Sequence, residues 1–175
     1  MERAIMIGDK AVVLSNSSRA LVYYREQFGR EYFDELKSAE QVEGFKKTLR
    51  LECIGYQILW AMAKAADCTI SPPNMWMREL GKFSVKRALA EAERMIYDGM
   101  ETHCKSEGGE KKPFKTENLI SACIACGLSV DWALNMPLGM LIDILNEYAN
   151  SRKTGADEKG KDTVREATQA DYDDF

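Results

Sequence analysis

The sequence predicts a mainly α-helical protein, a helical bundle with a short N-terminal β-hairpin and a flexible acidic C-terminal tail. Apolar residues recur every three or four positions over most of residues 1–149, which is the spacing of amphipathic helices. Two short apolar runs at the N-terminus are joined through Gly8-Asp9-Lys10, a typical hairpin turn. Residues 150–166 contain almost no apolar side chains and are expected to form a flexible linker. We therefore expect a helical body over residues 1–149 and a tail over residues 150–175.

The first half of the body is expected to contain three helices. Ser17 or Ser18 can cap a helix that ends at Gly29, and a short helix follows over residues 31–37. The longest pattern covers residues 39–66. Its inward stripe is predicted to consist of Val42, Phe45, Leu49, Cys53, Tyr56, Trp60 and Ala63. A second stripe starts at Leu51, so this half is apolar on two sides and belongs in the middle of the bundle.

The second half of the body contains further helix starts. Helices are predicted to begin near Pro73, Ser84, Thr116, Ser129 and Pro137, where a capping side chain or a first-turn proline stands. The helix after Ser84 is expected to reach about His103, followed by a polar loop over residues 105–113. Gly127 is expected to close the helix that starts at Thr116.

The charge is close to balanced, with 24 Lys and Arg against 28 Asp and Glu. Residues 156–175 contain seven acids and three bases, so their net charge of −4 equals that of the whole chain. Because no basic surface is available to collect phosphates, nucleic-acid binding is not expected. A regulator whose acidic tail mimics nucleic acid is a further alternative.

The chain is expected to act in the cytoplasm. Its first residues, MERAIMIGDK, lack the apolar core of a signal peptide, and no run approaches the length of a membrane span. Five cysteines in no regular framework fit reduced thiols better than secreted disulfides.

Catalytic residues are scarce, and we expect neither an enzyme nor a cofactor. His103 is the single histidine, and no phosphate-binding loop or zinc-protease motif occurs. Cys123 and Cys126 could form a zinc site with Cys104 and His103, although the spacing argues against it. A redox role is disfavoured as well, because the pair lies at a helix end that would raise a thiol pKa. A small thiol- or zinc-dependent protein remains the alternative function.

Methionine and tryptophan mark a candidate client-binding groove. Its proposed residues are Trp76, Met77, Trp132, Met136 and Met140, because methionine adapts easily to apolar partners. The competing interpretation is ordinary core filling. In the tail, Tyr172 and Phe175 are candidate anchors for a second partner, against the alternative of an acidic end that merely aids solubility.

Several segments resemble the tail assembly chaperones of long-tailed, siphovirus-type phages and prophages of Gram-positive bacteria. They are ALVYYREQFGREYFDEL, ECIGYQILWAMAKAAD with the following PPNMWMREL, LNMPLGMLIDILNEY and ATQADYDDF, together about half the chain. None of them is a catalytic signature.

The resemblance implies a non-enzymatic role in virion assembly. Such chaperones bind the long helical tape-measure protein, keep it soluble and recruit tail-tube subunits in the host bacterial cytoplasm. They leave before the virion is complete. In many of these phages a frameshift appends a second segment, and the composition change near Asn150 resembles that junction. Self-association is left open, and neither a nucleic acid nor a membrane is an expected partner.

Overall fold

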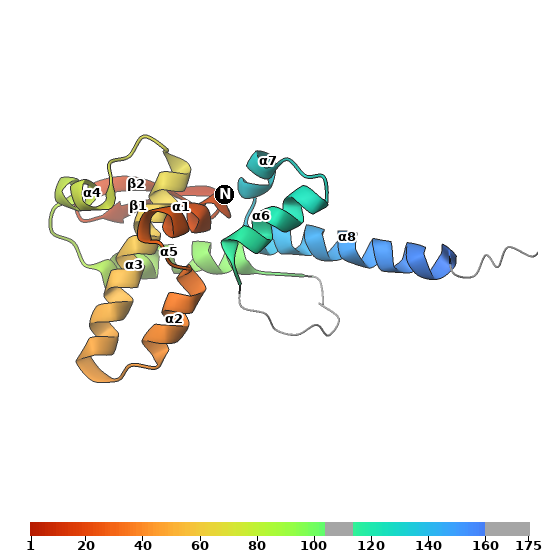
Figure 1. Ribbon diagram of the computed structural model, residues 1–175. Coiled ribbons are helices and arrows are strands. Elements are labelled where there is room, and N and C mark those ends of the chain that lie inside the picture. The colour runs from red at the N-terminus through yellow and green to blue at the C-terminus, as the bar shows by residue number, and fades with distance from the viewer. Residues whose placement is uncertain (104–113, 160–175) are drawn as a thin grey trace, which may run out of the picture.

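The structure, a computed structural model, describes residues 1–103 and 114–159 (Figure 1). The described chain is mainly helical and begins with a two-stranded antiparallel hairpin, which confirms the predicted fold class. Its elements are β1 (Glu2–Ile7), β2 (Lys10–Ser15), α1 (Arg19–Phe28), α2 (Tyr32–Glu40), α3 (Gly44–Ala66), α4 (Pro73–Leu80), α5 (Val85–Met100), α6 (Thr116–Ala125), α7 (Val130–Leu134) and α8 (Leu138–Lys159).

The hairpin turns where the sequence predicts it. Ile7 lies opposite Lys10, and Gly8 in the turn has a φ of 62°, a left-handed conformation that costs glycine little. Ile5, Ile7 and Leu14 are buried, because the inner face of the hairpin packs against helices. β2 contacts α3, and β1 contacts α5.

The second half of α3 forms the centre of the body. It contacts α1, α2, α4, α5 and β2, and eight of its last thirteen residues are buried apolar residues: Ile54, Tyr56, Ile58, Leu59, Trp60, Ala61, Met62 and Ala63. Between them, Gly55 allows α5 to approach closely, since a Cβ on Gly55 would overlap Leu89 Cδ1. The predicted central position is confirmed for this half of the helix.

The first half of α3 differs from the prediction. The expected single helix over residues 39–66 is interrupted between Glu40 and Gly44, where α2 ends and α3 begins. Phe45 and Leu49 are 81% and 56% exposed, and Cys53 is exposed as well. Their predicted inward orientation is wrong because α2 contacts α3 without covering this face. In Figure 1, α2 and the first half of α3 project from the body as an arm.

Serine and threonine caps are confirmed only in part. Ser84 Oγ accepts a hydrogen bond from Arg87 N at 3.4 Å, as a helix cap does. Ser18 and Ser129 occupy the residue before a helix but make no side-chain cap bond. Thr116 lies inside α6, because Lys115 is the residue before that helix. The predicted helix ends at Gly29 and Gly127 are confirmed, with φ values of 68° and 72°.

The hydroxyl of Ser18 connects distant parts of the chain. Ser18 Oγ and Ser18 N both donate to the carbonyl oxygen of Met136, at 2.9 Å and 2.7 Å. Ser17 also forms a β-bridge with Pro137. These bonds fix the start of α1 to the join between α7 and α8.

The last helices depart from two predicted boundaries. α5 ends at Met100, before His103, and α8 continues through residue 150 to Lys159. α8 crosses the end of α5 so closely that a Cβ on Gly139 would overlap Glu101 O. The loop over residues 105–113 and the tail anchors Tyr172 and Phe175 lie outside the described residues, as does the body-to-tail junction expected from a frameshift.

No helix in the described ranges is both long enough and apolar enough to cross a membrane.

Candidate partner-binding surfaces

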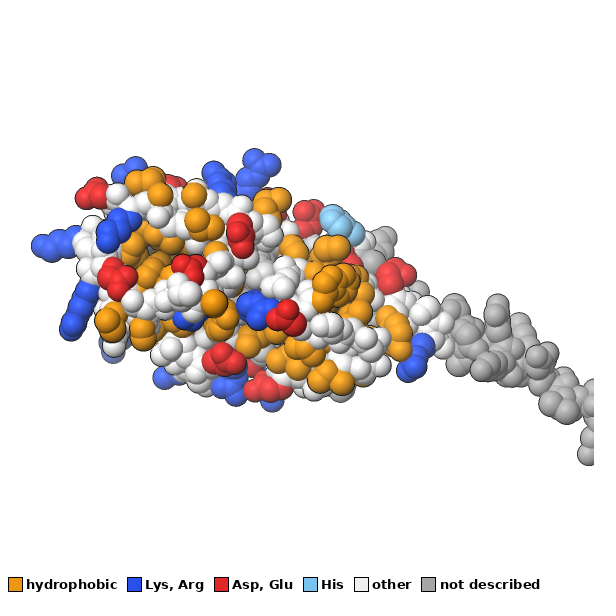
Figure 2. Space-filling model, turned by 90° about the horizontal axis from the view of Figure 1, so that it is seen from above, with side chains coloured by type: hydrophobic (Ala, Val, Ile, Leu, Met, Phe, Trp, Pro, Cys, Tyr) orange, Lys and Arg blue, Asp and Glu red, His pale blue; other side chains and the backbone are white. Residues whose placement is uncertain are grey.

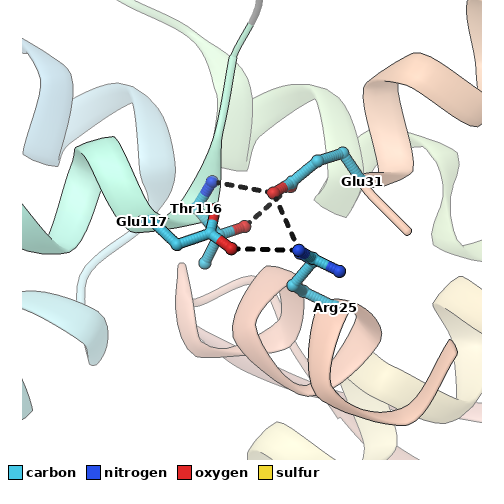
Figure 3. A network of polar contacts seen from close by, with 4 residues as sticks. All are labelled: Arg25, Glu31, Thr116 and Glu117. Atoms are coloured by element: carbon cyan, nitrogen blue, oxygen red, sulfur yellow. Dashed lines mark hydrogen bonds and ion pairs between the residues drawn. The ribbon is translucent and has the colours of Figure 1, made fainter. Parts of the chain in front are cut away.

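A polar network holds α6 against α1 and α2 (Figure 3). The carboxylate of Glu31 accepts bonds from Thr116 N at 3.1 Å and Thr116 Oγ1 at 2.8 Å. Arg25 lies between two acids, with its Nε 3.4 Å from Glu31 and its Nη2 3.1 Å from Glu117. The carboxylate of Glu31 thus satisfies the first backbone N–H of α6, as a capping side chain would. Thr116 therefore serves as a donor to Glu31, the residue before α2, rather than as the predicted cap.

A second polar cluster lies where the arm joins the body. Tyr24 Oη donates to Glu35 Oε2 at 2.7 Å and lies 2.9 Å from Gln57 Oε1 on α3. Arg30 Nη1 lies 2.8 Å from the other oxygen of Glu35. Burial opposes ionisation of Glu35, but the bonds from Arg30 and Tyr24 outweigh it and lower the pKa of the carboxyl. The cluster fixes the root of the arm with a buried, ionised carboxylate.

The arm carries an apolar surface that faces solvent. Phe45, Leu49 and Cys53 follow each other at intervals of four residues on α3, and all three are exposed. Residues at this spacing lie on one face of a helix, one turn apart. We call Phe45, Leu49 and Cys53 the arm surface. A helix face of this kind can pack against an apolar helix of another protein.

A second exposed pair lies at the other end of the body. Trp132 on α7 and Met140 on α8 are 55% and 54% exposed, and only a short join at Met136 and Pro137 separates their helices. Arg19 holds α7 in place through an ion pair with Asp131, at 2.6 Å. We call Trp132 and Met140 the corner surface. In Figure 2, orange side chains gather on the half of the molecule that also carries the pale blue histidine side chain.

The five residues predicted to form the client groove lie in different parts of the structure. Trp76 and Met136 are buried, and the rings of Trp76 and Tyr56 lie 5.8 Å apart in the core. Both residues therefore fit the core-filling interpretation. Met77 is partly exposed on α4, which lies at the opposite end of the body from α7 and α8 (Figure 1). The five residues do not line one groove. Trp132 and Met140 are exposed on the consecutive helices α7 and α8.

The thiol pair lies at the C-terminal end of α6, with Cys123 buried and Cys126 partly buried. Cys123 is fully buried at the end of α6, and burial raises the pKa of its thiol, with a further contribution from Cys126. His103 is exposed, and its backbone N–H donates to Asp143 Oδ2 at 2.8 Å. Cys104 lies outside the described residues. Within the described ranges, no three His, Cys, Asp or Glu side chains are placed to hold a metal ion.

A small apolar pocket lies between α1, α3, α5 and α8. Its volume is about 40 Å³, and it is lined by apolar groups such as Leu21, Ile58, Met62 and Leu138. A space of this size is far below the volume of a ligand site, which is roughly 300–1,000 Å³. It is a packing defect at the meeting point of four helices.

No protein-family model, curated protein or solved structure matches this chain.

The arm surface was missed by sequence reasoning. Periodicity identifies the shared face of Phe45, Leu49 and Cys53 but does not state what covers it. Two features of the sequence could have raised the question: a glycine, Gly44, precedes Phe45, and two lysines, Lys46 and Lys47, follow it directly. A charged pair within the first turn is typical of a helix end that lies away from the core.

Proposed function

We propose that this chain is a tail assembly chaperone of a long-tailed phage or prophage. In this role it binds the tape-measure protein, keeps it soluble and recruits tail-tube protein in the host bacterial cytoplasm. The segments that resemble this family support the proposal. The observation that carries it is the arm surface, a rigid helical face whose apolar side chains are left without a partner in the described chain.

The arm surface suits a helical client. Fully burying an apolar side chain contributes about 1.5–3 kcal/mol, so covering Phe45 and Leu49 supplies a useful but moderate binding free energy. Moderate affinity fits a chaperone that has to leave its client. The flanking charges are mixed, with exposed Lys46 on one side and exposed Glu52 on the other, so recognition rests on the apolar stripe and not on net charge.

Several weak contacts on one molecule would together give a sufficient overall affinity for a long client. A second apolar contact on the same molecule raises the overall affinity through its effective concentration. The corner surface, with Trp132 and Met140, is the second contact in this proposal. The tail anchors Tyr172 and Phe175 are assigned to tube protein on the basis of the sequence alone.

The proposal is tested by co-expression with the large helical protein encoded immediately downstream. Soluble client and the amount that co-purifies are measured for the native chain and for a Phe45→Ser, Leu49→Ser double variant. We expect the native chain to keep the client soluble, and we expect the double variant to lose most of the co-purified client. Both positions are exposed, so the fold of the variant should be unchanged.

Tyr97→Ser is the matched control. Tyr97 is a comparably exposed aromatic residue, 71% accessible, on α5 and outside both surfaces. This variant should retain the client at the native level. A client that stays insoluble beside the native chain would contradict the chaperone role. Equal losses in the control and the double variant would instead contradict the assignment of the arm.

A further inference from the structure

The hairpin has one strand edge that the rest of the described chain leaves open. The backbone N–H of Met6 in β1 donates to Glu91 Oε2 on α5, at 3.3 Å, and therefore points away from β2. Met6 is the register partner of Ala11. In an antiparallel pair, both partners of such a position turn their N–H and C=O groups outward. The backbone groups of Ala11 thus point away from β1.

The same orientation recurs two residues further along β2. Pair types alternate along an antiparallel ladder, so Val13, the partner of Ala4, also turns its backbone groups outward. No described residue beyond the hairpin forms a backbone hydrogen bond with Ala11 or Val13. The β1 edge is occupied at Met6 by Glu91. Among the described residues, none forms a backbone hydrogen bond with the two outward donors and two outward acceptors of the β2 edge.

A preformed groove runs beside this open edge. Its volume is about 450 Å³, and it is lined by β2, by the segment between α3 and α4, and by α4 itself. In Figure 1 that segment arches over the hairpin before α4 begins. Its apolar lining includes Ile70 and the small exposed parts of Trp76 and Leu80, which are 4% and 8% exposed. An extended peptide beside β2 would turn every second side chain towards the same face.

The wall opposite β2 is held by hydrogen bonds. Lys64 Nζ donates to the carbonyl oxygens of Cys68 and Ile70, at 2.6 Å and 3.0 Å. Ser71 Oγ donates to Glu79 Oε1 at 2.6 Å, and Trp60 Nε1 donates to Ser71 O at 3.0 Å. A wall fixed in this way does not have to be ordered when a ligand enters, which lowers the cost of binding.

The charged residues that line the groove favour a basic peptide over an acidic one. Among the described residues that line it, two carry carboxylates, Asp67 and Glu79, and one, Lys10, carries a positive charge. The ammonium of Lys64, bound to the carbonyls of Cys68 and Ile70, lines a neighbouring pocket instead. An acidic strand, including the C-terminal segment with its net charge of −4, would be repelled. A strand that carries Lys or Arg between its apolar residues would be attracted.

We propose that the β2 edge binds an extended segment of another protein, a strand with alternating apolar residues and at least one basic residue. The segment adds to the hairpin as a third strand by pairing with the outward groups of Ala11 and Val13. The four residues from Lys10 to Val13 span about 13 Å, which accommodates three or four residues of the partner. This site is separate from the arm surface and does not depend on the client role.

The test selects binders from a displayed library of random short peptides against the full chain. We expect enrichment of peptides that alternate apolar residues and contain Lys or Arg. The best peptide is then synthesised with a fluorescent label, and its affinity is measured for two variants. Val13→Pro removes one outward donor without removing a ladder bond, and it should weaken binding about tenfold. Ala4→Pro makes the matched change on the opposite edge of the same residue pair and should leave binding unchanged.

Amide hydrogen exchange of the native chain gives a readout that does not rely on a variant folding. The bound peptide should slow exchange at Ala11 and Val13 and leave Met6 unchanged. The proposal is overturned if no peptide is enriched or if the two proline variants bind the peptide equally well. It is also overturned if the peptide slows amide exchange only outside β2. Dimerisation through β2 in the absence of peptide would also overturn it, since the occupant would then be a second copy of this chain.

Discussion

Both halves of α3 have apolar residues at helical spacing, but one half is buried and the other is exposed to solvent. From Ile54 to Ala63 the helix is enclosed by helices and by the hairpin, whereas from Gly44 to Cys53 one apolar face remains in solvent. The stripe that contains Phe45 and Leu49 continues directly into Tyr56 and Trp60, which are buried. The periodicity of a helix defines which side chains share a face, and only the neighbouring elements determine whether that face is core or binding surface.

The largest contrast is expected between two leucines on this helix. Leu59 is fully buried, so Leu59→Ala should lower the free energy of unfolding by about 2–5 kcal/mol. Leu49→Ala should change it by less than about 0.5 kcal/mol, because Leu49 is exposed. Urea denaturation measures both. A comparable loss in the two variants would mean that the first half of α3 is covered in solution.

The close approach of α5 to the buried half gives the next effect. Gly55→Ala places a methyl group on Leu89 and should destabilise the protein by about 1–3 kcal/mol. Leu89→Ala removes the clashing atoms. The double variant should therefore be more stable than the sum of the two single effects predicts, as measured in a double-mutant cycle. Strict additivity would contradict the contact between Gly55 and Leu89.

The free energy of unfolding should depend on pH through Glu35, which lies on α2 where the arm joins the body. Its pKa is lowered in the folded protein from a value of 4.5, so its stabilising contribution is present above that value. The contribution is lost as the pH falls through the lowered folded pKa. Glu35→Gln should cost about 1–2 kcal/mol at neutral pH, and its stability should fall less than that of the native chain below pH 4.5. Parallel curves of unfolding free energy against pH would contradict an ionised Glu35 bonded to Tyr24 and Arg30.

The smallest effect on stability, and the largest on binding, is expected on the arm. Phe45→Ala should leave the thermal midpoint nearly unchanged, within about 0.5 kcal/mol of unfolding free energy, while reducing the amount of client that co-purifies. Thermal denaturation and quantitative pull-down provide the two measurements. A marked loss of stability without loss of client would assign Phe45 to the core.

The sequence was sufficient for local features. The turn at Gly8, the start of α4 at Pro73, the end of α6 at Gly127 and the burial of the second half of α3 follow from turn chemistry, proline geometry and periodicity. These features depend on a few neighbouring residues or on a pattern that is apolar on two sides. They were therefore predicted correctly.

Long-range contacts account for what the sequence could not supply. Ser18 satisfies a carbonyl 118 residues away instead of its own helix, and Thr116 donates to Glu31 across the body. Trp76 and Trp132 both stand near the start of a helix, yet Trp76 is buried beside Tyr56 and Trp132 is 55% exposed. The candidate groove failed because composition cannot place α4 and α8 relative to one another.

The central claim is that the uncovered half of α3 binds the client, and hydrogen exchange of the complex tests it most directly. The chain is co-purified with a tape-measure protein, the proposed client, and amide exchange along α3 is compared with that of the free chain. The account predicts slower exchange over the turns that contain Phe45 and Leu49, with little change in the already buried half. Unchanged exchange over those turns, with protection confined to other helices, would contradict it.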